Sequence, residues 1–349
     1  MMDGNAAAAY DPGSFLHLSS LAAPMFKLHR RPFLAAAAAT FALAAGAAQA
    51  AWPEKPIRIV VTFGAGGASD IVAREIATPL AQLLGQPVIV DNKPGAGGTI
   101  GGSEVVRSAP DGYTLMLSNS TPLSIGPFTL ARLPYDPVHQ FTHIAMLGVA
   151  PVLIMANPKA GIASLKDIPK AVGSAGGQMG FGSGGPGSIG QIVGEMMKAD
   201  MKVNLDHVPY RGGAPMSADL LAGTIPLGID VITAYVPMVK LGQLTGLAVT
   251  SRSRSPLLPN VPTVAEAGFP DLVADNYFGV SGPAGLPAPI VEKLRAALAE
   301  IVARPAILKR FEELGVLPGY AGPAAFTGMV EKQIRDWTPA IKASDLGPK

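Results

Sequence analysis

The chain has 349 residues, of which 48% are hydrophobic and 15% charged, so it can bury a large core and is not a disordered protein. Its 27 Lys and Arg residues nearly balance 25 Asp and Glu residues, with a formal net charge of +2; nucleic acid is therefore not an expected partner. The sequence contains no cysteine, which excludes disulfides, thiolate metal sites and a lipid anchor on an N-terminal cysteine. The length favours two domains.

Residues 1–50 have the pattern of an export signal. From Met25 onward, a basic segment with Arg30 and Arg31 precedes an Ala-rich apolar run, and the small residues of an A-x-A site end at Ala50. This order predicts a secretory signal peptide that starts at Met25 and is cleaved after about Ala50. The arginine pair resembles a twin-arginine signal. A permanent membrane anchor is disfavoured because the apolar run is shorter than the roughly 20 residues that span a bilayer. We expect a periplasmic protein without a lipid anchor.

The stretch 58–70, RIVVTFGAGGASD, is where we expect a ligand to bind. A β-branched apolar run at 59–61 predicts a buried strand of an α/β sheet. Apolar residues at helical spacing then predict a helix, with Ser69 or Asp70 as its N-cap and Gly85 as its stop. The turn between strand and helix contains Gly64, Gly66 and Gly67. Glycines let the backbone approach a ligand, and the free N–H groups of the first helical turn favour an anion.

The pattern of strand, glycine-rich turn and helix recurs twice. One copy has a strand at 87–91, a turn at 92–98 and a helix at 99–108. The other has the turn 179–188, MGFGSGGPGS, before a helix at 189–198. Three such turns predict that several helix N-termini converge on one cleft. The alternative is that the turns are ordinary tight connections between strands and helices.

Strands and helices continue to alternate along the chain, which predicts parallel strands with crossover helices in a doubly wound α/β fold. We interpret the order as a first lobe formed by 51–153 and 278–349, with a second lobe, 154–277, inserted into it. The chain then crosses twice between the lobes, and two crossings form a hinge. Further strands are expected at 113–117, 152–156, 178–182, 203–208, 225–230, 246–250 and 275–280, and further helices at 215–222, 234–241, 289–303, 305–315 and 323–343.

A series of short motifs runs through the mature chain. They are WPEKPIR at 52–58, GGASD at 66–70, GQPVIVDNKPGAGG at 85–98, PDGYTL at 110–115, LPYDP at 133–137, GS at 182–183 and at 187–188, HVPYRG at 207–212, LPNVPTVAEAG at 258–268 and PAG at 283–285. This series resembles the Bug family, the extracytoplasmic solute receptors of tripartite tricarboxylate transporters. Two positions depart from the family pattern: Ala65 stands where Pro is usual, and Gln191 where His is usual.

The resemblance implies a two-lobed periplasmic binding protein, type 2-like, with a doubly wound sheet in each lobe. It implies a receptor that closes on a small organic carboxylate: a di- or tricarboxylate, an aromatic acid or an amino acid. One carboxyl group would be held by loops of both lobes and ordered waters. The implied partners are the membrane subunits of the transporter. The alternative function is a ligand-loaded receptor that signals to a membrane sensor kinase. We expect a monomer.

The glycine-rich turns predict a carboxylate held by backbone N–H groups, helix dipoles and hydroxyls rather than by a cation. Arg211 would pair with a distal carboxylate, or else is a solvated surface residue. Asp230 would accept from a ligand amine or hydroxyl, or else caps the helix that starts near Ala234. The candidate ligand-binding residues are Phe63, Gly66, Gly67, Ser69, Asp70, Asn119, Thr121, Ser183, Ser188, Arg211 and Asp230.

An enzymatic function has little support in the sequence. The turn at 64–69 is superficially similar to a dinucleotide fingerprint, but Ser69 replaces the third glycine and Asp91 is poorly spaced for the partner acid. The glycine-rich turns contain no G-x-S-x-G elbow, and the histidines of the mature chain show no metal-ligand spacing. We therefore predict no catalytic residue, no cofactor and no metal site. A nucleotide-dependent enzyme is the remote alternative.

Overall fold

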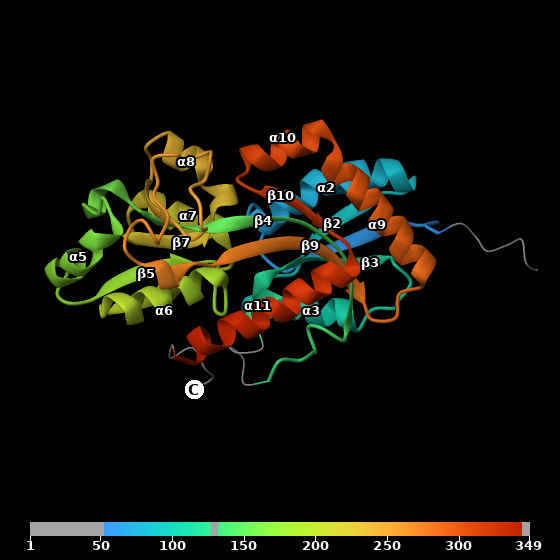
Figure 1. Ribbon diagram of the computed structural model, residues 1–349, viewed down its shortest axis with the longest axis horizontal. Helices are drawn as coiled ribbons and strands as arrows, with labels where there is room; N and C mark the ends of the chain where they lie inside the picture. The colour runs from blue at the N-terminus through green and yellow to red at the C-terminus, as the bar shows by residue number, and fades with distance from the viewer. Residues whose placement is uncertain (1–51, 127–131, 344–349) are drawn as a thin grey trace, which may run out of the picture. The chain divides into compact units, whose positions relative to one another are not determined.

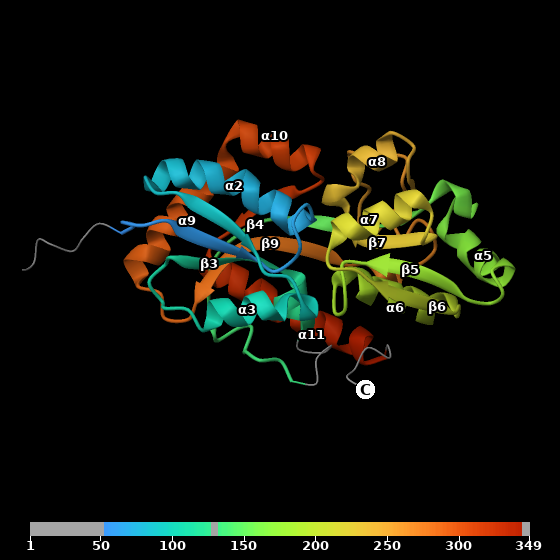
Figure 2. The ribbon, with the colours of Figure 1, turned by 180° about the vertical axis from the view of Figure 1, so that it is seen from behind.

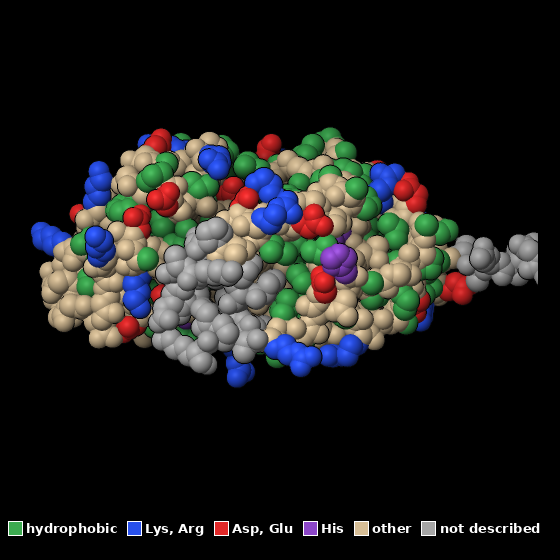
Figure 3. Space-filling model, turned by 60° about the horizontal axis from the view of Figure 1, so that its bottom comes forward, with side chains coloured by type: hydrophobic (Ala, Val, Ile, Leu, Met, Phe, Trp, Pro, Cys, Tyr) green, Lys and Arg blue, Asp and Glu red, His purple; other side chains and the backbone are tan. Residues whose placement is uncertain are grey.

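The computed structural model describes residues 52–126 and 132–343 (Figure 1). The region 1–50 lies outside the described residues. It contains the predicted signal peptide, with its start at Met25 and its arginine pair Arg30-Arg31. No helix within the described ranges is both long enough and apolar enough to cross a membrane. On the face shown in Figure 3, basic side chains are scattered among acidic ones, in keeping with the near balance of charges.

Ten strands of the described ranges form one sheet in the order β2-β1-β3-β9-β4-β7-β5-β6, and β10 and β8 each pair with β4. β1 pairs in parallel with β2 and β3, and β5 in parallel with β6 and β7. Strands joined by crossover helices are expected to pair in this way. The strands are β1 (Ile57–Val61), β2 (Val88–Asn92), β3 (Thr114–Asn119), β4 (Phe141–Ala156), β5 (Met179–Ser183), β6 (Leu205–Pro209), β7 (Leu227–Val231), β8 (Thr245–Val249), β9 (Asp275–Pro283) and β10 (Leu317–Ala321).

The 16-residue strand β4 links the two parallel groups. Its residues 141–151 pair antiparallel with β9, whereas its residues 152–156 pair antiparallel with β7 and β8. The other edge of β9 pairs antiparallel with β3. Figures 1 and 2 show β4 and β9 between β1–β3 on one side and β5–β7 on the other. Two antiparallel strands thus connect a β1–β3 group to a β5–β7 group.

Helices cover both faces of the β1–β3 group. α2, α9 and α10 lie on one face, and α3 and α11 on the other (Figures 1 and 2). Alternation along β1 supplies both cores: Ile59 and Val61 pack in the cluster that contains α2, while Val60 packs with Val105 of α3 and Phe326 of α11. The α-helices are α2 (Ala68–Leu84), α3 (Thr99–Val106), α5 (Ile168–Ser174), α6 (Ile189–Met201), α7 (Gly213–Ala222), α8 (Val236–Lys240), α9 (Ala288–Ala303), α10 (Pro305–Glu313) and α11 (Pro323–Ala343).

Every strand and helix predicted from the sequence is present, with ends that differ by a few residues. Residues 141–151 of β4 were not predicted, because Thr142, His143 and Gly148 interrupt their apolar pattern. β10 was also missed, since it contains Pro318 and Gly319, which are rare inside strands. Both are antiparallel additions to the expected parallel sheet.

The start of α2 differs from its prediction. The helix begins at Ala68 with Gly67 as its N-cap, so the assignment of Ser69 or Asp70 was wrong. The Asp70 carboxylate instead accepts from the Gly66 backbone N–H (2.9 Å) and from Arg74 Nε (3.0 Å). It therefore braces the turn before the helix. The predicted stop is confirmed: Gly85 has φ of +72° and caps the last turn.

Close packing against β7 fixes the position of the first turn of α6. A Cβ atom added to Gly190 would lie 2.0 Å from the carbonyl oxygen of Ile229. Because Gly190 lacks a side chain, the helix can begin directly beside the end of the strand. This approach brings the N-terminus of α6 to the edge of the sheet where the loops gather.

We expect Gly190→Ala to destabilise the protein by about 1–3 kcal/mol, because helix and strand must separate to admit the methyl group. The matched control is Gly173→Ala in α5, where an added Cβ would meet no atom within 4 Å. That change should be neutral or stabilising by about 0.4–1 kcal/mol, since it lowers the entropy of the unfolded chain. Urea unfolding of both variants measures the two effects, and equal stabilities would contradict the packing argument.

Candidate functional site

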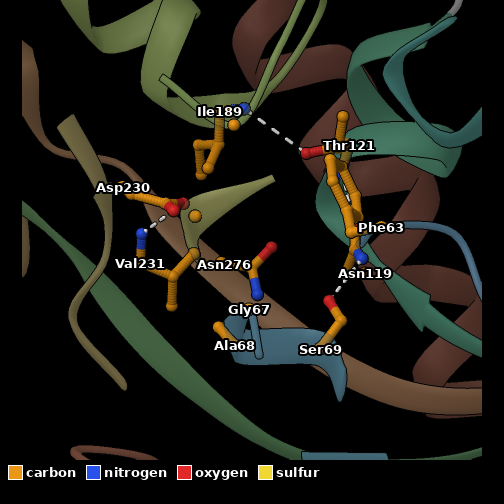
Figure 4. Close-up of a pocket in the computed structure, with 12 residues that line it drawn as sticks. Phe63, Gly67, Ala68, Ser69, Asn119, Thr121, Ile189, Asp230, Val231 and Asn276 are labelled. Carbon is orange, nitrogen blue, oxygen red and sulfur yellow. Dashed lines mark hydrogen bonds between the residues drawn. The ribbon is translucent and has the colours of Figure 1, made fainter. Parts of the chain in front are cut away.

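A small cavity lies where both groups of strands present their loops (Figure 4). Its volume is about 30 Å³, and since about 10–15 Å³ on this measure holds one water, the cavity suits a group of carboxylate size. The contributing segments are the β1–α2 turn, the end of β3 with the helical turn η2 (Thr121–Ile125), the β5–α6 loop, the start of α7, the end of β7 and β9. The lining residues are Phe63, Gly67, Ala68, Ser69, Asn119, Thr121, Gly184, Ile189, Gly213, Asp230, Val231 and Asn276.

Three helices start at this cavity. α2 starts after Gly67, α6 at Ile189 and α7 at Gly213. The first-turn N–H groups of a helix have no partner within the helix, and the helix dipole places partial positive charge there. Among the described residues that line the cavity, none is Lys, Arg or His. The arrangement favours an anion whose charge is met by main-chain donors.

The two strand groups touch across the cavity. The Ile189 backbone N–H, in the first turn of α6, donates to Thr121 Oγ1 at 3.3 Å (Figure 4). Beside it, a Cβ atom added to Gly64 would lie 2.5 Å from the backbone oxygen of Arg211, so the β1–α2 and β6–α7 loops are in close contact. Segments of both strand groups therefore meet at the cavity.

Ser69 and Asn119 form a hydrogen-bonded pair on one wall. Asn119 Nδ2 donates to Ser69 Oγ at 2.9 Å, and Asn119 Oδ1 accepts from the Thr121 backbone N–H at 3.0 Å. The Asn119 amide is therefore fixed at both ends. Because the Ser69 oxygen accepts from Asn119, its own O–H proton is free to donate to a ligand.

Asp230 supplies a carboxylate to the same cavity. Its Oδ1 accepts from the Val231 backbone N–H (2.8 Å) and its Oδ2 from the Tyr235 hydroxyl (2.9 Å). Burial raises the pKa of Asp230 to about 6. A carboxylate offers about four acceptor positions, so Asp230 can still accept from a ligand. The helix-capping alternative is wrong, because α8 begins at Val236 without a side-chain cap.

Ser183 and Ser188 lie behind the cavity wall rather than on it. Ser188 caps α6 by accepting from the Gln191 backbone N–H (3.3 Å), and it donates to Ser183 Oγ (2.9 Å), which lies 2.6 Å from His207 Nε2. Burial lowers the pKa of His207 to about 4, so the imidazole is neutral at pH 7. Since Ser183 is fully buried, this serine–histidine pair braces the loop and offers no exposed nucleophile. Gln191 also braces it by accepting from the Gly187 backbone N–H.

Arg211 lies outside the small cavity, as do Gly66 and Asp70 in the turn described above. It lines a second, larger cavity of about 450 Å³, which shares Phe63 and Gly184 with the first. Phe63 therefore stands between an inner and an outer cavity. Arg211 forms no ion pair with any described residue. The outer cavity is lined by Phe63, Pro94, Gly95, Ala96, Gly97, Gly98, Ile100, Gly184, Gly185, Pro186, Tyr210 and Arg211.

Of the eleven candidates, the structure brings six to the inner cavity: Phe63, Gly67, Ser69, Asn119, Thr121 and Asp230. Sequence reasoning missed Asn276 of β9, whose side chain is 2% exposed. Its Oδ1 accepts from the Ser120 backbone N–H at 3.3 Å, but its Nδ2 has no hydrogen-bond partner among the described residues. A buried, unpaired donor costs about 1–3 kcal/mol. The available signal was an amide residue directly before the apolar residues Tyr277 and Phe278 of a predicted strand.

The described residues do not form a metal-binding group. Within the described ranges, no group of three or more His, Cys, Asp or Glu side chains is arranged to hold a metal ion.

Known proteins resemble this chain in both sequence and fold. BugT of Bordetella pertussis is 33% identical over 305 residues, which cover 87% of this chain and 94% of BugT. The periplasmic binding protein BugD is 32% identical with a TM-score of 0.81, covering 85% of this chain and 100% of BugD. An R. palustris protein solved with adipate is 31% identical with a TM-score of 0.82, covering 85% and 100%. MatC from Rhodopseudomonas palustris with bound malate is 30% identical with a TM-score of 0.79, covering 83% and 100%.

The family match agrees with the motifs found in the sequence. Residues 72–346 match the model described as the tripartite tricarboxylate transporter family receptor. The matched range begins inside α2 and extends past α11, so it includes the second and third glycine-rich turns and both connecting strands. The fold is the two-lobed α/β fold of the periplasmic binding proteins it resembles. The chain belongs to the family of tripartite tricarboxylate transporter receptors.

Proposed function

We propose that this protein is an extracytoplasmic receptor that captures a small organic carboxylate between its two lobes and delivers it to the membrane subunits of a tripartite tricarboxylate transporter. The ligand class is a di- or tricarboxylate, an aromatic acid or an amino acid. The observation that carries the proposal is the inner cavity, where α2, α6 and α7 start and where no described lining residue is Lys, Arg or His. The relatives solved with adipate and malate support a carboxylate as the ligand.

The donors around the inner cavity are sufficient for useful affinity. Each charge-assisted hydrogen bond contributes roughly 1.5–3 kcal/mol, and each helix dipole about 0.3–1 kcal/mol. Three or four such contacts reach about −8 kcal/mol, which corresponds to micromolar binding. Neutral donors achieve this without burying a second charge, whose desolvation would cost several kcal/mol.

Closure of the lobes follows from the position of these donors. We assign lobe 1 to 51–153 with 278–349 and lobe 2 to 154–277, a division supported by the change of pairing partner along β4 after Pro151. α2 then belongs to lobe 1, and α6 and α7 to lobe 2. A ligand that contacts all three helix starts holds the lobes together, and β4 and β9 form the hinge between them.

The place of action is the periplasm, reached through cleavage of the predicted signal peptide after about Ala50. The arginine pair Arg30-Arg31 favours the twin-arginine route. The solved relative BugD is a periplasmic binding protein, which supports this location. Signal exchange with a membrane sensor kinase would use the same cavity and differ only in the partner surface.

The purified mature chain should release a small carboxylate when it is denatured and analysed by mass spectrometry. In a thermal-shift screen, dicarboxylates, aromatic acids and amino acids at a hundred times their Kd stabilise the folded state by about 2.7 kcal/mol, and the matching class should raise the Tm by several degrees. NAD should have no effect. A Tm raised by NAD alone would overturn the proposal in favour of a nucleotide-dependent enzyme.

Gly67→Val should lower ligand affinity at least tenfold and leave the Tm within a few degrees of the wild-type value. The backbone at Gly67 has φ of −81°, which valine adopts without strain, but its Cβ would stand 3.8 Å from the Gly213 backbone nitrogen. The side chain would therefore block the helix starts. Gly328→Val, where an added Cβ meets no atom within 4 Å, is the matched control. Calorimetric affinity within threefold of wild type for Gly67→Val would contradict the site.

Asp230→Asn should stabilise the ligand-free protein at pH 7 but not at pH 4. The pKa of Asp230 rises from 3.8 to about 6 on folding, so the folded state binds its proton more tightly. The stability that the wild-type protein gains from protonated Asp230 is fully present below pH 4 and is lost as the pH rises through 6. Between pH 4 and pH 7, the free energy of unfolding of the variant should therefore rise by about 1–3 kcal/mol relative to that of the wild type. Urea unfolding at several pH values measures the difference, and a difference that does not change with pH would count against it.

A further inference from the structure

The inner cavity presents a hydrogen-bond donor from a third strand, separate from the helix starts. Asn276 lies on β9, which pairs with both β3 and β4. Asn276 is buried and is one of the residues that line the cavity. Its oxygen accepts from the Ser120 backbone N–H, and its Nδ2 has no hydrogen-bond partner among the described residues. Figure 4 shows the amide nitrogen on the side of Gly67 and Ala68, where α2 begins. A buried donor fixed in this way is ready to bind an oxygen of a ligand.

Asp230 gives the same cavity an acceptor. Its two carboxylate oxygens each accept one hydrogen bond from the protein, so each oxygen retains capacity for another. A ligand carboxylate placed against Asp230 would be repelled by like charge in a site without water-like screening. The ligand carboxylate therefore belongs with the donors of Asn276 and α2, and the group that faces Asp230 must itself donate.

We propose that Asn276 and Asp230 together select acids that carry a hydroxyl or ammonium group on the carbon next to the bound carboxylate. The inference rests on the proposed function and names the ligand class of that site. Asn276 donates to an oxygen of the carboxylate, and Asp230 accepts from the substituent on the adjacent carbon. Both residues contact the ligand and determine specificity.

The size of the cavity limits what can meet Asp230. About 30 Å³ accommodates the carboxylate and its nearest carbon, and the rest of a longer acid must pass Phe63 into the outer cavity of about 450 Å³. The atom that reaches Asp230 is then the substituent on the adjacent carbon, whatever the length of the acid. A distal carboxylate would lie in the outer cavity, where Arg211 is available.

An acid without the substituent leaves Asp230 buried and facing a carbon atom. Sites built to hydrogen-bond a hydroxyl or amino group discriminate strongly against analogues that lack it, because their own polar group is left unpaired. We expect at least a tenfold preference for malate over succinate, and for 2-hydroxyglutarate over glutarate. Each pair differs only in the hydroxyl group, and aspartate tests the ammonium group at the same length as malate.

Calorimetric titration of the mature protein with these five acids tests the preference, and three variants test its origin. Asn276→Asp keeps the acceptor for Ser120 but replaces the donor with a charge, so the affinities for malate and succinate should both fall at least tenfold. Asn276→Leu removes the donor without adding charge and should also lower the affinity for both acids. Asp230→Asn should instead reduce the malate preference at least fivefold. Asn260→Asp, at an exposed asparagine, is the matched control and should leave every affinity within twofold.

The outcomes separate this inference from the proposed function. If malate and succinate bind the wild-type protein equally well, the inference is overturned and the carboxylate receptor remains. Unchanged affinity in either Asn276 variant, with a Tm showing that it is folded, also overturns it. If Asp230→Asn keeps the full preference, Asp230 is not the acceptor. If none of the acids binds while NAD does, the proposed function fails and this inference fails with it.

Discussion

The arrangement of this protein depends on one requirement: main-chain N–H groups from three helix starts must reach one cavity whose described lining contains no Lys, Arg or His. A helix start can come so close only if the residues around it are small. Gly190 allows α6 to begin against β7, and Gly213, whose Cβ would lie 2.7 Å from both Asp230 Oδ2 and the Tyr235 hydroxyl, allows the same for α7. Glycine is thus a packing requirement at these two helix starts, and the chemistry of the site follows from that packing.

Two antiparallel strands, β4 and β9, connect the two strand groups, so that loops of both groups line the cavity. β4 exchanges β9 for β7 and β8 as its pairing partners, so one continuous strand carries the contacts of both groups. The donors divide in the same way, with α2 on one side and α6 and α7 on the other. The bond from Ile189 to Thr121 crosses between them. An anion held in this cavity would therefore contact donors of both strand groups at once.

Sequence reasoning predicted most of the fold because its signals were local. Glycine-rich turns between apolar strands and periodic helices identified the elements, and the order of strands and helices indicated the parallel groups. It failed where pairing was long-range: residues 141–151 become a strand only because β9 returns beside them, and β10 is a strand despite Pro318. The N-cap of α2 was misplaced for a similar reason, since Asp70 bonds to the preceding turn and to Arg74 rather than capping the helix.

Sequence reasoning predicted the parts of the site that a backbone pattern indicates, such as the glycine-rich turns. It missed the part that depends on a single side chain. Asn276 comes from a strand far along the chain, and an amide residue near the start of a predicted strand does not by itself indicate a ligand contact. Its significance appears only once its oxygen is seen to bond Ser120 while its nitrogen stays unpaired. Asp230 likewise sits in a partly buried position, and desolvation raises its pKa to about 6. Residues that break the rules of a stable core and are retained in a cavity are expected at functional sites. In this protein the unpaired donor and the acid with a raised pKa line the same cavity, and their common location is a stronger argument for ligand contact than either residue alone.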